Sequence, residues 1–285
     1  MKKKILEERS RVSLNKKISA AYFEISLEAP NIAANSLPGQ FIEIKISSSL
    51  DPLLRRPLSI HWAGHLPIVK SSSRHKKANI GTGNLKIVYE VVGKGTEILS
   101  QKRPGDYLDI IGPLGQGFVY RTPNTEHRTP ILVAGGMGVA PLFFLAEKLV
   151  HGPQSTAHGK PLVVIGARSK EGILCEQEFK KLGCEFRVAT DDGSQGFKGR
   201  VSDLLANLLL TVDCRLSTIY ACGPKQMLKA LTQISKQYNI PAQVSLESHM
   251  ACGIGACLGC VVNTSGGFKR VCKDGPVFKA EEIIW

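Results

Sequence analysis

Four cysteines near the end of the chain are spaced so that they could bind metal together. Cys252, Cys257, Cys260 and Cys272 are half of the eight cysteines in a chain of 285 residues. The first three follow the pattern C-x4-C-x2-C, and the fourth comes a short distance later. This spacing is typical of the thiolate ligands of a [2Fe–2S] cluster. The sequence therefore predicts such a cluster in this region.

Glycines between the cysteines agree with that prediction. Gly253, Gly255 and Gly259 permit positive φ angles and a close approach of backbone N–H groups to sulfur. A structural zinc site with four thiolates is the alternative, but zinc ribbons usually pair two C-x2-C knuckles. Disulfides are a more distant alternative, because they are rare in cytoplasmic proteins.

Two motifs in the first half of the chain could bind phosphate groups. Residues 55–60 read RRPLSI, in which an arginine can pair with pyrophosphate and a serine can hydrogen-bond a flavin ring or ribityl chain. Residues 93–96 read GKGT at the start of a predicted helix, where a capping threonine and N–H groups could hold phosphate oxygens. The first motif alone is weak evidence, since a surface arginine is common, and the second strengthens it.

A glycine-rich turn indicates a dinucleotide site. Residues 134–141 read AGGMGVAP, follow a predicted strand and open a predicted helix, which is the usual context of such a turn. The pattern G-G-x-G-x-A-P differs from G-x-G-x-x-G, so a plain strand–helix turn is the alternative. Residues 221–224 read ACGP and end a later predicted strand, where ligands of parallel sheets collect.

The first part of the chain, residues 1–122, reads as short strands interrupted by proline and glycine. Such a pattern predicts an antiparallel β-barrel. The predicted strands are 21–28, 40–46, 58–62, 85–92 and 107–111, and one short helix is predicted over 95–102. The polar segment 121–130 reads as a linker.

Beyond the linker, strands and helices alternate. This alternation predicts an α/β domain over residues 130–247, with a parallel sheet covered on both faces. The predicted strands are 131–134, 162–165, 186–189, 217–221 and 243–247, and the predicted helices are 141–150, 175–182, 201–209 and 225–238. Residues 248–285, rich in glycine and cysteine, are expected to form a small separate module that holds the cluster.

Charge and hydropathy exclude several classes of partner. Much of the formal net charge of +13 lies in residues 1–20, with seven basic and two acidic side chains, and in residues 65–83, with four basic and none acidic. No recognition helix or aromatic-rich strand accompanies these charges, so we expect a basic edge or a surface for an acidic protein and no nucleic-acid binding. No signal peptide or membrane span is expected, because charges interrupt the start of the chain and the longest apolar stretch, 131–146, is too short. These features predict a cytoplasmic protein.

The order of the motifs resembles the ferredoxin–NADP reductase superfamily: R-P-x-S in a barrel, then G-G-x-G-x-A-P, then C-G-P. The cysteine region is more specific. ESHMACGIGAC at 247–257 and VCKDGP at 271–276 look like the electron-transfer subunits of NAD-dependent dihydroorotate dehydrogenases. The resemblance covers nearly the whole chain.

That resemblance implies FAD in the barrel, NAD on the α/β domain and the [2Fe–2S] cluster near the end, with no catalytic acid or base in this subunit. The implied FAD contacts are Arg56, Pro57, Leu58, Ser59, Val88, Tyr89, Glu90, Gly95 and Thr96. The implied NAD contacts are Gly135, Gly136, Gly138, Pro141, Cys222, Gly223 and Pro224. The implied cluster ligands are Cys252, Cys257, Cys260 and Cys272.

The resemblance also implies a partner, an FMN-containing catalytic subunit that oxidises dihydroorotate to orotate in pyrimidine (UMP) biosynthesis. Two copies of each subunit would form a heterotetramer. Electrons would pass from that FMN through the [2Fe–2S] cluster to FAD, and leave as hydride to NAD+. Arg168 and Ser169, just after the second predicted strand of the α/β domain, could accommodate a 2′-phosphate, so NADP stays open.

Two other functions stay open. One is the small flavin subunit of an NADH-dependent ferredoxin:NADP reductase, or a related hydrogenase-associated diaphorase. In the former the first cluster ligand is typically aspartate, whereas this chain has Cys252. The other, much less favoured, is a zinc-bearing adaptor without enzymatic activity, which would be colourless.

Overall fold

The computed structural model describes residues 4–65, 83–120, 129–152, 160–211 and 217–285. The basic segment 65–83, the predicted linker 121–130 and Cys214 lie wholly or almost wholly outside these ranges. The backbone forms two compact units, Met1–Leu37 with Phe41–Leu114, and Pro38–Gln40 with Gly115–Trp285. The sequence suggested three parts instead, with a separate module from residue 248. Within the described ranges, no helix is long and apolar enough to cross a membrane.

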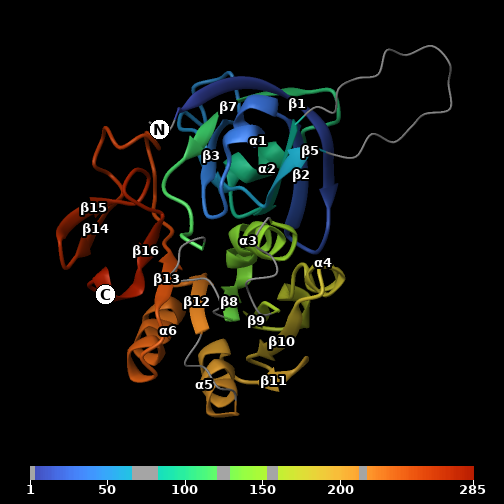
Figure 1. Cartoon of the computed structure of the whole chain (residues 1–285). Coiled ribbons are helices and arrows are strands. Elements are labelled where there is room, and N and C mark those ends of the chain that lie inside the picture. The colour runs from blue at the N-terminus through green and yellow to red at the C-terminus, as the bar shows by residue number, and fades with distance from the viewer. Residues whose placement is uncertain (1–3, 66–82, 121–128, 153–159, 212–216) are drawn as a thin grey trace. The chain divides into compact units, whose positions relative to one another are not determined.

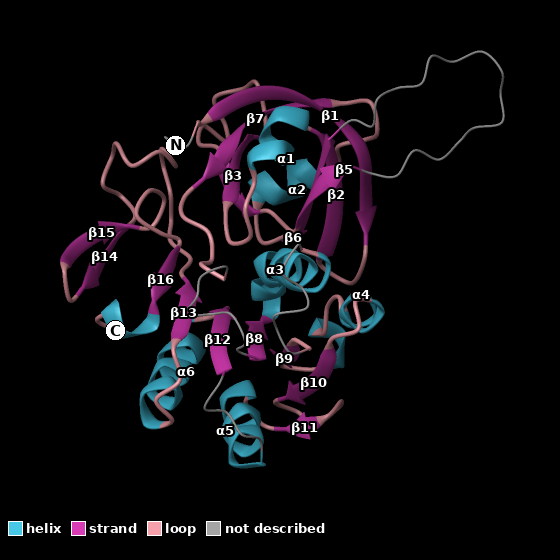
Figure 2. Cartoon of the chain, viewed as in Figure 1, coloured by secondary structure: helices cyan, strands magenta, loops and turns pink. Residues whose placement is uncertain are grey.

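The first unit is an antiparallel sheet, as the sequence predicts (Figures 1 and 2). Its described strands are hydrogen-bonded in the order β4-β3-β7-β1-β2-β6-β5. The elements are β1 (Leu6–Lys17), β2 (Tyr22–Glu28), α1 (Pro30–Asn35), β3 (Phe41–Lys45), β4 (Arg56–Ser59), β5 (Trp62–His65), β6 (Gly83–Glu90), α2 (Lys94–Ser100) and β7 (Tyr107–Leu114).

The sheet of the first unit curls into a barrel. β4 pairs with β3 at one edge and β5 pairs with β6 at the other, although only Ile60 and His61 separate β4 from β5 in the chain. Such close neighbours can lie at opposite edges only if the two edges approach each other. Contacts between β4 and β6 confirm this closure. The single strand predicted over 58–62 is therefore wrong, because it contains the step from one edge to the other.

Sequence reasoning missed β1, which lies in the middle of the sheet between β2 and β7. Its outward side chains are charged, so the alternation of apolar residues is weak. These charges meet partners on the neighbouring strands. The guanidinium of Arg9 lies 4.8 Å from the centre of the Tyr107 ring, and Arg11 pairs with Glu28 at 3.2 Å. Cross-strand pairs of this kind stabilise a solvated sheet face.

The second unit is built on a mostly parallel sheet in the order β11-β10-β9-β8-β12-β13-β16. Each helix predicted for this region is present. The elements are β8 (Thr129–Gly135), η1 (Gly136–Gly138), α3 (Val139–His151), β9 (Leu162–Ala167), η2 (Lys170–Gly172), α4 (Glu176–Lys181), β10 (Glu185–Thr190), β11 (Phe197–Lys198), α5 (Val201–Thr211), β12 (Ser217–Cys222), α6 (Lys225–Gln237) and β13 (Ala242–Ser245).

The strands on the two sides of β8 come from different parts of the chain. β9 and β10, on one side, follow β8 directly, and β12, on the other side, comes later. Right-handed crossovers then place α3 and α4 on one face and α5 and α6 on the opposite face. The rings of Phe143 and Phe179 link α3 to α4, with centroids 5.2 Å apart. The switch point between β8 and β12 is where open α/β sheets bind ligands.

The end of the chain returns to this sheet. It forms the hairpin β14 (Val261–Thr264) and β15 (Gly267–Arg270), then β16 (Val277–Lys279) and the short helix η4 (Ala280–Glu282). β16 pairs antiparallel with β13 and buries Val277 and Phe278. The cluster module, residues 248–285, is therefore joined to the α/β sheet through β16. The pairing also covers hydrogen-bonding groups that an edge strand would leave exposed.

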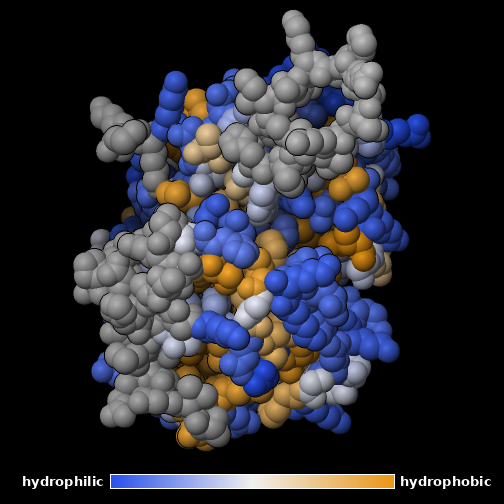
Figure 3. All heavy atoms as spheres, turned by 45° about the vertical axis from the view of Figure 1, so that its right-hand side comes forward, coloured by the Kyte–Doolittle hydropathy of each residue, from blue (hydrophilic) through white to orange (hydrophobic). Residues whose placement is uncertain are grey.

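Buried apolar side chains on the strands and helices form the cores of both units. The face drawn in Figure 3 shows hydrophilic residues interspersed with hydrophobic ones that stay at the surface. Scattered exposed apolar residues are normal in folded proteins, so only those close to a functional group carry information.

Candidate cofactor sites

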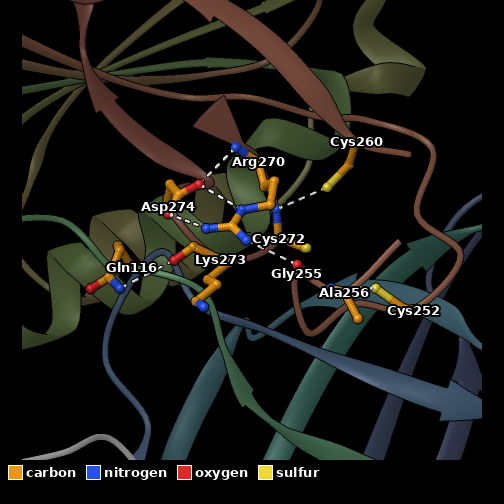
Figure 4. A network of polar contacts seen from close by, with 9 residues as sticks. All are labelled: Gln116, Cys252, Gly255, Ala256, Cys260, Arg270, Cys272, Lys273 and Asp274. Atoms are coloured by element: carbon orange, nitrogen blue, oxygen red, sulfur yellow. Dashed lines mark hydrogen bonds and ion pairs between the residues drawn. The ribbon is translucent and has the colours of Figure 1, made fainter. Parts of the chain in front are cut away.

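The four cysteines near the end of the chain come together in the structure. Cys252, Cys257 and Cys260 lie on the loop between β13 and β14, and Cys272 lies on the turn after β15. Figure 4 shows Cys252, Cys260 and Cys272. The thiol of Cys252 interacts with that of Cys257, and the thiol of Cys272 with that of Cys260. Cys252 and Cys272 are also close enough for their charges to interact. Cys257 is exposed, whereas Cys260 and Cys272 are buried.

Backbone N–H groups point at three of the sulfur atoms. Ala256 donates to Sγ of Cys252 at 3.3 Å, Gly259 to Sγ of Cys257 at 3.5 Å, and Cys272 to Sγ of Cys260 at 3.4 Å. Donors in these positions stabilise thiolates and tune the potential of a bound cluster.

The two thiols at the ends of the motif differ in acidity. Burial opposes ionisation of Cys252, but hydrogen bonds, chiefly from backbone N–H groups of its loop, outweigh it and lower its pKa to about 6. Burial, followed by the hydrogen bond with Cys260, raises the pKa of Cys272 to about 12. A bound cation would hold all four sulfurs as thiolates.

The pairing of the thiols fits a two-iron cluster. Among the described residues, no group of three or more His, Cys, Asp or Glu side chains is arranged to hold a single metal ion. The sulfurs form two pairs instead, which is the arrangement needed when each of two irons takes two thiolates. The donors and the N–H groups directed at them therefore fit the predicted [2Fe–2S] group.

The loop conformation explains the glycines. Gly253 and Gly255 have φ angles of 67° and 84°, in the region that favours glycine. Gly259 has no such requirement, because a β-carbon there would make an ordinary contact of 3.5 Å with Sγ of Cys257. Leu258 takes a left-handed φ of 59° without being glycine, which the sequence does not reveal.

Arg56 and the GKGT turn meet in the first unit. The guanidinium of Arg56, on β4, lies against Gly95 in the first turn of α2, where a β-carbon would collide with it. An arginine and the first turn of a helix both attract phosphate oxygens. Thr96 caps the same turn, since its Oγ1 accepts from the N–H groups of Val92 and Gly93 at 3.0 and 3.3 Å. The donors present fit the pyrophosphate of a flavin dinucleotide.

The remaining predicted FAD contacts lie at the meeting of β4 and β6. Pro57, Leu58, Ser59 and Glu90 are half-buried, and Val88 is buried. The ring of Tyr89 faces the interior, where it stacks on Phe23 with centroids 5.7 Å apart and its hydroxyl donates to Asn15 at 3.1 Å. The ring of Tyr89 is therefore not available to a flavin. Burial raises the pKa of Tyr89 to about 12.

The two predicted NAD motifs meet at the switch point of the parallel sheet. β8 and β12 are paired neighbours, so the turns after them lie side by side. A β-carbon on Gly138 would collide with the carbonyl group of Cys222, and one on Gly223 would lie 2.9 Å from the backbone nitrogen of Gly135. Gly135 is also packed against Pro224 and Met227. The glycines are therefore required by contact between the two turns.

The same turns leave open space beside the start of α3. Gly136 has a φ of 52° and nothing lies within 4 Å of the position of a β-carbon, while Pro141 is buried in the first turn of α3. Cys222 is buried at the end of β12, and burial raises its pKa to about 12. A neutral thiol and an open backbone beside a helix start fit the anionic pyrophosphate of a dinucleotide.

One feature was not found from the sequence. Arg270 makes a two-point contact with Asp274 and also donates to the carbonyl oxygen of Gly255, inside the cysteine loop (Figure 4). Asp274 raises the pKa of Arg270, and Arg270 in turn lowers the pKa of Asp274, so both groups are charged at neutral pH. Nothing in the spacing of residues 255, 270 and 274 indicates that they meet.

Comparison with protein families matches two parts of the second unit. Residues 247–284 match the iron–sulfur cluster binding domain of dihydroorotate dehydrogenase B, and residues 132–233 match an oxidoreductase NAD-binding domain. These matches agree with the positions of the cysteine loop and of the two glycine turns.

Relatives similar over nearly the whole chain are known. The chain is 41% identical over 281 residues to the electron transfer subunit of dihydroorotate dehydrogenase B (NAD(+)) from Geobacillus kaustophilus, covering 97% of this chain and 98% of the relative. It is 40% identical over 268 residues to the protein of the same name from Desulforamulus reducens, covering 92% of each.

Solved structures show the same architecture. An NADH-dependent reduced ferredoxin-NADP oxidoreductase, studied for electron bifurcation, superposes with a TM-score of 0.78 at 30% identity, covering 97% of this chain and 90% of that one. A ferredoxin NADP+ reductase from Neisseria gonorrhoeae with bound FAD and NADP superposes with a TM-score of 0.63 at 13% identity, covering 81% and 91%, which concerns the fold alone.

Proposed function

The chain belongs to the family of electron transfer subunits of dihydroorotate dehydrogenase B (NAD(+)), and from this premise we propose that it connects a dihydroorotate-oxidising partner to NAD+. Its cofactors are a [2Fe–2S] cluster, FAD and NAD. When bound, the cluster carries single electrons, the nicotinamide takes a hydride, and FAD converts between the two. The chain itself has to hold these groups and exclude side reactions.

In the first unit, Arg56 and the first turn of α2 hold the FAD pyrophosphate. Arg56 is suited to this role because its guanidinium lies over Gly95. The neighbouring Arg55 is less suited, since both its terminal nitrogens already donate, to the carbonyl of Asp109 at 2.8 Å and to Glu7 at 3.0 Å. Arg56 uses one terminal nitrogen, Nη1, for the carbonyl of Leu54 at 2.7 Å. The backbone of residues 88–90 and the side chain of Ser59 complete the flavin site.

In the second unit, the turns 135–141 and 222–224 receive NAD. NAD is favoured over NADP by the groups after β9. The hydroxyl of Ser169 donates to the carboxylate of Glu171 at 2.5 Å, and this bond lowers the pKa of Glu171. A 2′-phosphate at Ser169 would therefore meet a negative charge, whereas a ribose hydroxyl could donate to it.

The cysteine loop faces the partner subunit. Cys257 is exposed, and the apolar side chains beside it are exposed too, 46% for Ile254 and 62% for Leu258. Phe268, on the adjoining β15 strand, is 79% exposed. An electron can enter the cluster from another protein only if that protein covers this loop, and exposed aromatic residues are typical anchors of such contacts.

The partner is an FMN-containing catalytic subunit that oxidises dihydroorotate to orotate in UMP biosynthesis, and the complex is a heterotetramer with two of each subunit. The names of the relatives, which call them electron transfer subunits, support a partner. A cytoplasmic location follows from the need to keep the cluster thiols reduced.

One observation carries this proposal. Cys252 occupies the first ligand position, lies beside Cys257 and accepts the N–H of Ala256. A cysteine there separates the chain from the ferredoxin:NADP reductases, whose small subunits typically have aspartate.

The test is to produce the chain with its genomic partner and purify the complex. We expect a visible spectrum of flavin and iron–sulfur, about two irons per copy of this chain as the cluster type requires, and dihydroorotate-dependent reduction of NAD+. Replacement of NAD+ by NADP+ should slow the reaction. Flavin and iron–sulfur absorption without dihydroorotate activity would refute the substrate, and a colourless zinc protein would refute the whole proposal.

A second function has one observation in its favour, the similarity to the NADH-dependent reduced ferredoxin-NADP oxidoreductase over 97% of this chain. The same preparation separates the two functions. Reduction of ferredoxin coupled to the oxidation of NADPH, with no response to dihydroorotate, would favour the second function.

A further inference from the structure

Two charged residues link the two segments that carry the cluster cysteines. Arg270 is the last residue of β15, two positions before Cys272, and Asp274 is two positions after it. The backbone N–H groups of residues 273, 274 and 275 all donate to the carbonyl of Arg270, at 3.2, 2.8 and 3.2 Å. The carboxylate of Asp274 accepts the backbone N–H of Arg270 at 2.8 Å. Hydrogen bonds between its first and last residues therefore hold the turn that carries Cys272.

The side chain of Arg270 reaches from this turn to the cysteine loop. Nε donates to Oδ2 of Asp274 at 3.0 Å, and one terminal nitrogen donates to Oδ1 at 3.3 Å. The other terminal nitrogen donates to the carbonyl oxygen of Gly255 at 3.0 Å. Figure 4 shows Arg270 between Asp274 on one side and the Gly255 segment on the other. A planar guanidinium holds both partners with donors on three separate nitrogens in a fixed fork, whereas the donors of an ammonium group all lie on one nitrogen.

Gly255 is held firmly at this contact. It has a φ of 84°, and a β-carbon on Gly255 would lie only 2.6 Å from a side-chain carbon of Lys273. The next residue, Ala256, supplies the N–H that points at Sγ of Cys252. The contact from Arg270 to Gly255 therefore fixes the same peptide group that carries the ligand-directed N–H of Ala256, and the Arg270–Asp274 turn fixes Cys272.

The same guanidinium is a charge close to the sulfurs, since it interacts electrostatically with Cys272 and Cys260. A positive charge beside a cluster stabilises its reduced, more negative state, and a carboxylate does the opposite. Arg270 and its ion-pair partner Asp274 thus carry opposite charges two positions to either side of Cys272 in the chain.

We propose that Arg270 and Asp274 are positioning residues for the [2Fe–2S] cluster, which tie the Cys272 turn to the Cys252–Cys260 loop and set the reduction potential by their opposed charges. The inference rests on the cluster and not on the substrate. It therefore stands apart from the assignment of dihydroorotate.

The experiment is a redox titration of the cluster, followed by EPR, in the purified complex with its partner. Dithionite and mediators replace dihydroorotate and NAD, so the midpoint potential can be measured even if the proposed function is wrong. We expect Arg270→Gln to lower the midpoint potential and Asp274→Asn to raise it, because each removes one of the two charges. Asparagine keeps an acceptor for the N–H of Arg270, so the turn is retained.

Arg270→Lys separates charge from geometry. It should keep the midpoint potential close to that of the unmodified complex but release iron to a chelator several-fold faster, because one ammonium nitrogen cannot reproduce the three contacts that separate guanidinium nitrogens make with Asp274 and Gly255. The matched controls are Lys269→Gln and Glu282→Gln, which break an ion pair of 3.0 Å in the same module. Neither should move the potential.

Shifts of opposite sign in Arg270→Gln and Asp274→Asn would support the proposal. Shifts of the same sign, or none, would overturn it, because general loosening of the fold has no reason to reverse direction between the two. If Arg270→Gln binds no cluster, the other two variants decide. An upward shift in Asp274→Asn with an unchanged potential in Arg270→Lys supports the proposal, and any other pair of results overturns it.

Discussion

Gly138 lies against the carbonyl group of Cys222 with no room for a β-carbon between them. The two residues are far apart in the sequence, but β8 and β12, which precede them, are hydrogen-bonded neighbours. The contact fixes the two turns that we assign to NAD as one structure. A substitution at either residue should therefore alter nucleotide binding.

Gly138→Ala should weaken binding of NAD by about tenfold or more, since the methyl group must push one turn away from the other, at a cost of roughly 1–3 kcal/mol. The measurement is the dissociation constant for NADH of the purified complex, together with its thermal unfolding. Gly266→Ala is the control, because a β-carbon there would meet only Oγ1 of Thr264, at 3.9 Å. Equal NADH binding in both variants would contradict the assignment.

Arg56→Gln should lower the affinity for FAD about tenfold or more, because a hydrogen bond to a charged group contributes about 1.5–3 kcal/mol. Arg55→Gln is the matched control, since Arg55 is committed to Asp109 and Glu7. Flavin retained after gel filtration at low protein concentration is the readout. Flavin loss from the Arg55 variant instead would place the pyrophosphate elsewhere.

Tyr89→Phe should leave FAD bound, because the hydroxyl donates to Asn15 in the interior. Burial raises the pKa of Tyr89 from 10.0 to about 12, so the folded chain keeps its phenolic proton more tightly than the unfolded chain. This contribution to the free energy of unfolding is complete below pH 10 and is lost as the pH rises from 10 to about 12.

Tyr89→Phe has no phenolic proton, so its free energy of unfolding should fall less between neutral and alkaline pH than that of the unmodified chain. Denaturant unfolding of both proteins at pH 8 and pH 11 measures this difference. At neutral pH the variant should be less stable by about 1 kcal/mol, from the lost hydrogen bond to Asn15. Parallel pH profiles for the two proteins, or loss of flavin from the variant, would show that the ring does not lie where we describe it.

Phe268→Ala should weaken binding to the catalytic partner about tenfold, as truncation of an aromatic anchor does, with little change in thermal unfolding. Leu210→Ala on α5 is the control, since Leu210 is similarly exposed, at 73%, but lies on a helix outside the cluster module. Surface plasmon resonance or analytical ultracentrifugation would measure the affinity. A loss of affinity in the Leu210 variant alone would move the partner to another face.

Most of the candidate site was predictable because its signals are local. The spacing of Cys252, Cys257 and Cys260 specifies a loop around a cluster, and glycines such as Gly255 mark the backbone positions with positive φ. The strand–turn–helix order around Gly136 is present as predicted, and we propose this turn as the nucleotide site. These patterns hold within about ten residues, so one chain segment contains the whole signal.

What the sequence determined by itself is therefore the set of motifs: four thiols with the spacing of a [2Fe–2S] ligand set, an R-P-x-S segment and two glycine turns. Tertiary structure alone decided that β4 and β5 lie at opposite edges of a closed sheet, that the ring of Tyr89 faces inward, and that β16 completes the second sheet. It also decided that Arg270 meets Gly255. The physical reason is the same in each case. These contacts join residues that are distant in the chain or depend on which face of a strand is buried, and packing of the whole fold selects them.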